Sequence, residues 1–512
     1  MKKAEIDRGD VQGLVRFGYG WMEEACFFPL EVNDPAAARA WLQKISPAIT
    51  TAEKPAELPA TALHLAFTSA GLQALEVPQE IISQFSLEFV SGLTGEESRS
   101  RRLGDFASNA PSGWNWGGPG KTPHLLLMLY AKEGRLEERK KTLSVELAGA
   151  GFKLGQCLET SNLDGFEPFG FRDGISQPEI DWEQKRTLRV GKIEVEYGNL
   201  VATGEFILGY LNEYGEYTDR PLIDPQADIK NILLPAEDRP EKKDLGRNGT
   251  YMVFRQLRQD VRGFWRFLDR QADSNPEQRR NLAAAMVGRM MDGTRLVPKS
   301  ERPIRGVGTD LDPEDSAQDI ALNQFTYESD GAGLLCPYGA HVRRANPRNG
   351  DYPYGARGWF TRVKRIFGIG RKGNNRDDLI ASTRFHRILR RGREYGTNLP
   401  LEQALRGVDT SADERGLHFI CLNANIGRQF EFVQNAWMMG TKFDGLTEES
   451  DPLIGTRAPV PGCRLTDTFS MPQENGVRRR ISGLPQFVTV RGGAYFFLPS
   501  IRALRYIASR QK

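Results

Sequence analysis

The stretch "ALHLAFTSAGLQAL" (residues 62–75) begins as an apolar strand and continues directly into a helix. Much later in the chain, "LHFICLNANIGRQFEFVQNAWMM" (residues 417–439) also passes from an apolar strand into a helix. The two stretches share this pattern and not their letters, so they do not form a clear sequence repeat. We interpret them as corresponding units of two halves with related architecture.

Strands and helices alternate through the first half of the chain. Apolar runs predict strands at residues 11–20, 24–32, 123–131 and 204–215, with helices at 35–45 and 134–150. This alternation predicts an α/β or α+β sheet with helices packed on it. Residues 221–247 are rich in proline and charge, which predicts a linker or long surface loop. The chain is thereby divided into an N-terminal half, residues 1–220, and a C-terminal half, residues 248–512.

The composition excludes several classes of protein. The chain has 512 residues, of which 39% are hydrophobic and 10% aromatic, so a sizeable core is expected. A net charge of +3 is too small to indicate a nucleic-acid-binding protein. The N-terminal residues lack the apolar segment of a secretory signal, and no apolar run approaches the roughly 20 residues of a membrane helix. We therefore expect a soluble protein that is not exported and has no membrane partner.

The cysteines also bear on the compartment. Five are scattered along the chain, and no two are close enough for a CxxC motif: Cys26, Cys157, Cys336, Cys421 and Cys463. An odd and sparse set favours reduced thiols in a cytoplasmic protein over a disulfide framework, and it offers no zinc-site spacing.

One segment is strongly basic. Residues 343–393 contain fifteen Lys or Arg and only three acidic residues. A solvated basic loop is the favoured interpretation, and a partly buried anionic partner, such as a cofactor with carboxylates, is the alternative. Nucleic acid fits less well, because the aromatic residues do not alternate regularly with the basic ones. Within it, "GIGRKG" (residues 368–373) has the glycine spacing of a dinucleotide site, but no clear strand precedes it, so we reject that function.

Two residues are candidates for chemistry. Asp173 lies in "GFRDGISQP" (residues 170–178), where an Asp-Gly pair is most often only a turn. His341 lies in "CPYGAHVRRANPRNG" (residues 336–350) beside two small residues, and this setting suits a metal or haem ligand. His64 and His418 lie within apolar strands and are expected to be core residues. From the residues alone, both interpretations remain open for Asp173 and for His341.

Three separate motifs carry a family resemblance. "GFRDGISQP" resembles the GxxDG signature of the dye-decolourising (DyP-type) haem peroxidases, "CPYGAHVRRANPR" resembles their proximal-ligand segment, and "HRILRRGREYG" (residues 386–396) resembles their distal-arginine segment. Other segments of the chain also resemble the family and follow in the same order over nearly its whole length. In its length and extra loops the chain is similar to the long-chain members. The resemblance implies an α+β fold of two ferredoxin-like halves, each an antiparallel sheet with packed helices, as in the dimeric α/β-barrel-like superfamily. One haem b would lie in the C-terminal half.

The resemblance also assigns residues. His341 would be the proximal iron ligand and Asp173 the distal acid and base. Arg390 would be the distal arginine, with the neighbouring Arg391 left open as an alternative. Gly174 would let the backbone approach the haem face closely. The spacing between His341 and Arg390 is longer than in many members, so a basic insert is expected at about residues 350–380.

Three further residues are assigned to the surroundings of the haem. Glu431 would accept the hydrogen bond from the other ring nitrogen of His341. Its alternative is a glutamate on the face of a strand or helix. Arg343, and with less support Arg289, would pair with a haem propionate.

The implied activity is a peroxidase reaction. Hydrogen peroxide would oxidise dyes, phenols and other aromatic donors in one-electron steps through a ferryl intermediate, with an acidic optimum because the distal base is a carboxylate. The alternative is a haem-binding or haem- or iron-handling protein of the same fold with little turnover. Tyr338, Trp359 and Tyr395 are candidates for a surface electron relay or for ordinary packing. The sequence leaves the oligomeric state open between a monomer and a homo-oligomer.

Overall fold

One antiparallel sheet dominates the computed structural model, which describes residues 5–184, 198–300, 304, 317–350, 382–406, 414–457, 459 and 466–509. The strand order is β11-β13-β10-β16-β2-β3-β1-β4, with β12 paired to β13 and β5 paired to β1. The strands are β1 (Glu24–Val32), β2 (Thr61–Phe67), β3 (Leu125–Ala131), β4 (Phe152–Leu154), β5 (Leu158–Glu159), β10 (Thr250–Gln259), β11 (Leu389–Arg390), β12 (Arg393–Tyr395), β13 (Gly416–Asn423) and β16 (Val488–Leu498). All of these pairings are antiparallel.

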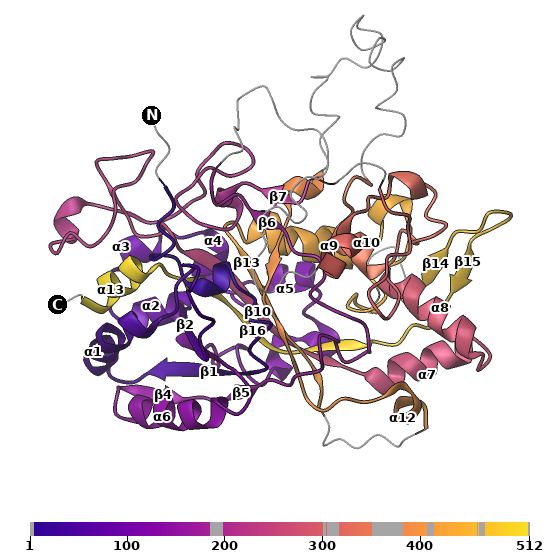
Figure 1. The fold of residues 1–512 in the computed structure, drawn as a ribbon, viewed down its shortest axis with the longest axis horizontal. Coiled ribbons are helices and arrows are strands. Elements are labelled where there is room, and N and C mark those ends of the chain that lie inside the picture. The colour runs from indigo at the N-terminus through magenta and orange to yellow at the C-terminus, as the bar shows by residue number, and fades with distance from the viewer. Residues whose placement is uncertain are drawn as a thin grey trace, which may run out of the picture.

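The sheet divides into two groups of strands that follow the sequence. β1 to β5 come from the first part of the chain and lie together, whereas β10 to β13 and β16 come from the last part. The groups meet where Phe67 of β2 pairs with Phe497 of β16. Figure 1 shows β10, β13 and β16 running together beside the indigo and purple elements of the first group. The predicted α+β class with two antiparallel halves is confirmed, while the predicted domain boundaries remain a prediction.

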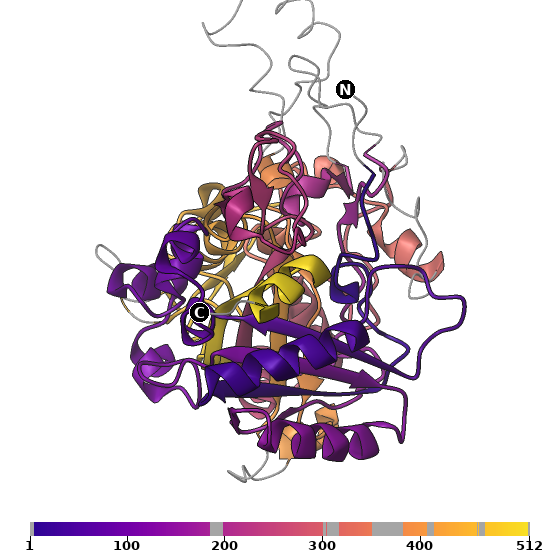
Figure 2. The same cartoon turned by 90° about the vertical axis from the view of Figure 1, so that its left-hand side faces the viewer.

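Helices cover the sheet. They are α1 (Pro35–Ile45), α2 (Ser69–Ala74), α3 (Gln79–Ile82), α4 (Leu87–Ser91), α5 (Glu97–Leu103), α6 (Leu136–Ala148), α7 (Val261–Gln271), α8 (Pro276–Val287), α9 (Ala317–Asn323), α10 (His341–Ala345), α12 (Leu401–Arg406) and α13 (Ile501–Ser509). α1 begins where predicted, because Asp34 accepts hydrogen bonds from the backbone N–H groups of Ala36 and Ala37 and proline occupies the first helical position. The indigo helix α1 and the yellow helix α13 lie side by side (Figures 1 and 2).

The core lies on both faces of the first group of strands. Phe28 of β1 belongs to the cluster that includes residues of α1 and α13, whereas its neighbour Phe27 belongs to a second cluster with Tyr19 and Tyr210. Both faces of β1 are therefore covered, which explains why its sequence is a continuous apolar run and not an alternating one.

Two predicted strands are wrong. Residues 11–20 contain a short 3₁₀ turn at Gly13–Val15, and the side chain of Gln12 bonds to the backbone of Leu65. Residues 204–215 begin within a 3₁₀ turn at Thr203–Glu205 and continue as a series of turns and bends. Most of their apolar side chains are buried, with Tyr214 exposed, but they lie in irregular backbone and not in strands.

The remaining strands are short pairs outside the main sheet. They are β6 (Glu179–Ile180) with β7 (Leu200–Val201), β8 (Leu222–Ile223) with β9 (Lys243–Asp244), and β14 (Phe469–Met471) with β15 (Arg479–Ile481). β8 and β9 lie within the predicted linker at 221–247. That segment is packed onto the protein, because Leu233 and Leu245 are buried and Arg220 forms a buried ion pair of 2.6 Å with Asp244. The predicted basic insert at about 350–380 lies outside the described residues, apart from its first position.

Candidate active site

His341 is the first residue of α10 and is held by a buried carboxylate. Its Nδ1 lies 3.0 Å from Oδ2 of Asp451, whose side chain is fully buried. The other oxygen of Asp451 accepts hydrogen bonds of 2.9 Å from the backbone N–H groups of Leu453 and Ile454. Burial lowers the pKa of His341, but the charge and hydrogen bond of Asp451 outweigh it, and the pKa is raised. In the described part of the chain, Nε2 of His341 has no hydrogen-bond partner.

This arrangement determines what His341 can do. With Asp451 ionised, Nδ1 of His341 keeps its proton and donates a hydrogen bond to the carboxylate. The lone pair of Nε2 is then free, and the negative charge of the carboxylate makes the imidazole a stronger electron-pair donor to a metal. An imidazole in this state is suited to bind a metal ion or a haem iron.

Asp173 and Arg390 form the second part of the site. Nη1 of Arg390 donates a hydrogen bond of 2.8 Å to Oδ1 of Asp173, and the same oxygen accepts one of 2.7 Å from the backbone N–H of Gly174. Burial raises the pKa of Asp173, but Arg390, the Gly174 N–H and His341 outweigh it, and the pKa is lowered. Asp173 is therefore held as a carboxylate.

The loop that carries Asp173 depends on glycine. Gly170 and Gly174 have φ angles of +93° and +77°, which L-residues with a side chain rarely adopt. A Cβ placed on Gly174 would have no atom within 4 Å, so this backbone borders open space. The backbone N–H of Asp173 bonds to the carbonyl of Gly165, at 2.9 Å. The bend therefore aims the carboxylate at Arg390, in agreement with the turn interpretation of Asp173, and its role in chemistry stays a prediction.

Arg390, and not Arg391, contacts Asp173. Arg390 ends β11, and its backbone N–H donates to the side-chain oxygen of Gln177 at 3.0 Å. Arg391 turns the other way and donates to backbone carbonyls of the N-terminal segment, including those of Leu14 and Arg16. The ambiguity of one residue in the motif is thereby resolved for the contact with Asp173.

The two parts of the site lie near each other. His341 and Asp173 lie close enough for each to shift the pKa of the other, and Arg390 acts on both. Burial is the largest influence on the pKa of each of the two, yet their side chains keep 29% and 33% of their surface accessible, and Arg390 keeps 32%. Side chains that are enclosed by protein and still accessible border a space inside the fold.

Glu431 does not contact His341, and its predicted role is wrong. One of its oxygens accepts from Nε of Arg99 at 2.7 Å and from the hydroxyl of Tyr495 at 3.0 Å, and the other lies 3.7 Å from Arg102. Glu431 lies in a π-helical turn, Gly427–Glu431, that aims it at these partners. The carboxylate at His341 is Asp451, which sequence reasoning missed because an Asp-Pro step in an acidic stretch is its only local signal.

Arg343 is also corrected as a candidate for a propionate. It donates to Oδ2 of Asp330 at 3.1 Å and to the carbonyl of Cys336 at 2.7 Å, and it lies between the rings of Tyr327 and Tyr338. Its charge is thus neutralised by Asp330, and it fixes the loop that leads to His341.

Arg289 differs from Arg343 in having no acidic partner among the residues that the structure describes. It is buried and donates to the carbonyls of Gly293 and Leu322, at 2.8 and 3.3 Å, with no carboxylate of the described residues in ion-pair range. Burial, followed by the neighbouring Arg348, lowers its pKa to about 10. A buried cation without a counter-charge is the expected partner of a bound anion, so Arg289 stays a candidate for a propionate.

The other histidines have structural partners. His64 bonds to the hydroxyl of Tyr19 at 3.0 Å, and burial lowers its pKa to about 3. His418 bonds to the carbonyl of Glu159, also at 3.0 Å, and burial lowers its pKa to about 4. Both are core residues, as predicted. Tyr395 stacks on His418 and is buried, in agreement with packing, while Trp359 lies outside the described residues.

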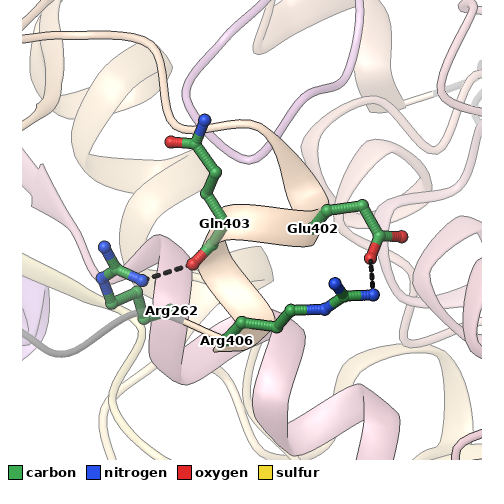
Figure 3. A pocket seen from close by; sticks show the side chains of 4 residues that line it. All are labelled: Arg262, Glu402, Gln403 and Arg406. Carbon is green, nitrogen blue, oxygen red and sulfur yellow. Dashed lines mark hydrogen bonds and ion pairs between the residues drawn. The ribbon is translucent and has the colours of Figure 1, made fainter.

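Other features of the structure are separate from this site. The hollow in Figure 3 lies between α7 and α12 and is lined by Arg262, Glu402, Gln403 and Arg406. None of these four residues belongs to the site of His341 and Asp173. Within the described ranges, no cluster of three or more His, Cys, Asp or Glu side chains could hold a metal ion. No helix in the same ranges is long and apolar enough to cross a membrane.

Several known proteins are similar to this chain in sequence. No family model matches it. A multifunctional dye peroxidase, DyP2, from an Amycolatopsis species is 30% identical over 392 residues, which cover 72% of this chain and 67% of that protein. The chain belongs to the dye-decolourising peroxidase family. A second member, dye-decolorizing peroxidase msp1 from Mycetinis scorodonius, is 28% identical over 526 residues, or 99% of this chain and 88% of its own.

Solved structures of dye-decolourising peroxidases have the same fold. The crystal structure of AauDyP complexed with imidazole superimposes with a TM-score of 0.71 over 99% of this chain and 100% of its own, at 23% identity. A decolorizing peroxidase from Auricularia auricula-judae gives a TM-score of 0.70 over 98% of this chain and 100% of its own, at 24% identity. The predicted family, enzyme class and fold of two ferredoxin-like halves are therefore confirmed.

Proposed function

We propose that this peroxidase is a haem b enzyme that uses hydrogen peroxide to oxidise dyes, phenols and other aromatic donors by one-electron steps. The observation that carries the proposal is the Asp173–Arg390 pair, which lies near an imidazole that is hydrogen-bonded to a buried carboxylate. The relatives named dye peroxidases support the substrate class. The free thiols of the described cysteines support a cytoplasmic location.

The residues fit a haem. Nε2 of His341 would bind the iron, Gly174 would leave room at one face, and Arg289 would pair with a propionate. When bound, the haem would supply the electrons that reduce peroxide and would take them back singly from aromatic donors. Asp451 would set the donor strength of His341, because it holds the proton of Nδ1.

Asp173 and Arg390 would then act on the peroxide. Asp173, held ionised by Arg390, would accept the proton from one peroxide oxygen and deliver it to the other, so that water can leave. Arg390 would stabilise the negative charge that develops as the O–O bond breaks, an effect that is strongest where water is excluded. Its single hydrogen bond of 2.8 Å to Asp173 leaves other N–H groups of the guanidinium for this purpose.

A visible spectrum of the haem-reconstituted protein before and after peroxide addition tests the proposal. We expect a Soret band that changes at once on adding peroxide and returns when a phenol or dye is supplied. A Soret band that does not respond would favour the alternative, a haem-binding protein of this fold with little turnover. His341→Ala should abolish haem retention, and a Soret band unchanged in that variant would contradict the assignment of the ligand.

A further inference from the structure

Two cysteines that the peroxidase site does not use lie together at the edge of the sheet. Cys26 is in β1, and Cys157 immediately precedes β5, which pairs antiparallel with β1. Cys26 lies opposite Glu159, so Cys157, two residues away from Glu159, is on the same face of the two strands. Both sulfurs are free thiols, each shifts the pKa of the other, and both side chains contact the same core cluster.

The backbone between β4 and β5 brings the two side chains together. β1 pairs with β4 at Leu30 and Leu154 and with β5 at Phe27 and Leu158. Three steps along β1 therefore correspond to four steps along the partner, which means that one extra residue bulges out just before Cys157. A bulge bends the strand and re-aims nearby side chains, and the short β5 at the sheet edge leaves this backbone room to adjust.

The two thiols are not equivalent. Cys26 is fully buried, whereas Cys157 is partly exposed. The neighbouring thiol of Cys26 and then the ammonium of Lys140 lower the pKa of Cys157, while the neighbouring thiol of Cys157 and burial raise the pKa of Cys26. Lys140 is fixed beside them by an ion pair of 2.6 Å with Glu159. A partly exposed thiol beside a cation is the reactive kind, and a buried neighbour is placed to resolve it.

We propose that Cys26 and Cys157 form a dithiol that hydrogen peroxide, the co-substrate of this enzyme class, oxidises to a disulfide. The thiolate of Cys157 attacks one peroxide oxygen, the O–O bond breaks, and the departing hydroxide takes a proton to become water. The sulfur of Cys26, losing its proton, then attacks the sulfenic acid of Cys157, and the S–O bond breaks to release a second water. The two thiols lose two electrons and the peroxide gains two, so no further reactant is needed.

The disulfide would act on the strand that leads to the catalytic loop. Beyond β5, the side chain of Thr160 hydrogen-bonds to the backbone of Ala25. The backbone N–H of Ser161 donates a hydrogen bond of 2.8 Å to the carbonyl of Glu394. The chain then continues into the loop that carries Asp173. Closure between Cys26 and Cys157 would tie the start of this segment covalently to β1. We therefore expect the oxidised protein to have a higher midpoint of thermal unfolding than the reduced protein.

Peptide mapping of the full-length haem-loaded protein tests the proposal. Reduced protein is treated with stoichiometric hydrogen peroxide, blocked with N-ethylmaleimide under denaturing conditions, and digested without reduction. We expect a cross-linked peptide pair containing Cys26 and Cys157 that dithiothreitol separates. Cys336, which is buried and has no thiol of another described cysteine beside it, is the internal control and should remain alkylated. Sulfinic acid at Cys157 with Cys26 still alkylated, or no reaction at either, would overturn the proposal.

Variants separate the roles of the two thiols. Cys26→Ala should leave a sulfenic acid on Cys157 that dimedone traps, whereas Cys157→Ser should slow the oxidation of Cys26 by at least about tenfold. Lys140→Gln should slow disulfide formation severalfold, and Lys153→Gln, which removes an exposed lysine on the adjacent β4, should not. If Cys26→Ala does not fold, the wild-type map and Cys157→Ser still decide the question.

The haem-free His341→Ala protein separates this proposal from the proposed function. The disulfide should form there at the same rate, because the reaction needs only two thiols and peroxide. Formation in the haem-loaded protein alone would overturn direct attack by Cys157. A missing Soret response together with an intact disulfide would count against the haem chemistry only.

Discussion

Asp173 and Arg390 form a hydrogen bond of 2.8 Å although 217 positions separate them in the chain. Asp173 comes from the loop that follows the first group of strands, and Arg390 ends a strand of the second group. The pair is thus assembled only when the whole chain has folded. It holds a carboxylate in its ionised form beside a cation, near His341.

Replacing Asp173 by Asn should slow the reaction with peroxide. The amide keeps the size of the side chain but cannot accept a proton, so we expect the second-order rate constant to fall by about 10²- to 10⁴-fold. Stopped-flow absorbance on the haem-loaded protein measures it, and the Soret band at rest should be unchanged. Asp164→Asn is the matched control, since Asp164 is exposed in the same loop and its φ of +55° tolerates asparagine. An equal loss in both variants would show that the loop, and not the proton acceptor, was affected.

The pH dependence of activity should follow the lowered pKa of Asp173. Because Arg390 keeps the pKa below the ordinary value near 4, Asp173 stays ionised through mildly acidic solution and is protonated only below that value. A base works in its ionised form, so kcat/KM for peroxide should hold as the pH falls and be lost only when the pH drops through the folded-state pKa. The stability that the ion pair contributes has the same sign and is lost in the same direction. A loss already complete by about pH 6 would point to a histidine base.

Asp451 and Glu431 can be distinguished by the potential of the iron. Asp451→Asn removes the negative charge at Nδ1 of His341, so we expect a more positive reduction potential and about 10- to 100-fold weaker haem retention. Glu431→Gln should leave the potential unchanged. It should instead destabilise the fold by about 1–3 kcal/mol, because the buried Arg99 keeps only the more exposed of its two carboxylate partners, Glu96. A spectroelectrochemical titration and a denaturant titration measure the two effects, and an equal shift of potential in both variants would contradict the assignment.

A methyl group at Gly174 should obstruct the site. Gly174→Ala imposes strain of about 1–2 kcal/mol at φ +77° and also places a methyl group in open space beside Asp173. Gly165→Ala imposes the same strain, since Gly165 has φ +79° and also has no atom within 4 Å of an added Cβ. We therefore expect similar thermal midpoints for the two variants but a slower peroxide reaction only for Gly174→Ala. Equal kinetics in both would show that Gly174 does not border the peroxide.

Arg289 and Arg343 should respond in opposite ways to the loss of their charge. Arg289→Gln removes a buried cation that has no acidic partner among the described residues, so the haem-free protein should not lose stability, while haem retention should fall about tenfold. Arg343→Gln breaks a buried ion pair with Asp330 and should destabilise the haem-free protein by about 3–5 kcal/mol. Calorimetry and haem titration measure both. Strong destabilisation of the haem-free protein by Arg289→Gln would rule out a role reserved for an anion.

The sequence predicted what depends on local pattern and on motifs. β1, α1 and the strand-to-helix unit at 62–75 follow from apolar runs and helix starts, and they lie where expected. The prediction of strands at 11–20 and 204–215 failed because an apolar run can also be buried in irregular backbone, so burial alone does not identify a strand. The prediction that Glu431 contacts His341 failed for another reason. The carboxylate that bonds to His341 is Asp451, which lies 110 positions away in the chain. No periodicity records such a contact.

The pairing of Phe67 with Phe497 has a consequence for how the enzyme operates. It makes the two groups of strands one hydrogen-bonded sheet, and α1 against α13 reinforces the connection. The loop of Asp173 packs through Phe169 and Phe171 against α7 and α8, and α10, which begins with His341, also contacts α8. Asp173 and His341 are therefore carried by elements that pack on the same two helices, beside one continuous sheet. Turnover should need no closing motion, and access of peroxide should be limited by diffusion through the protein.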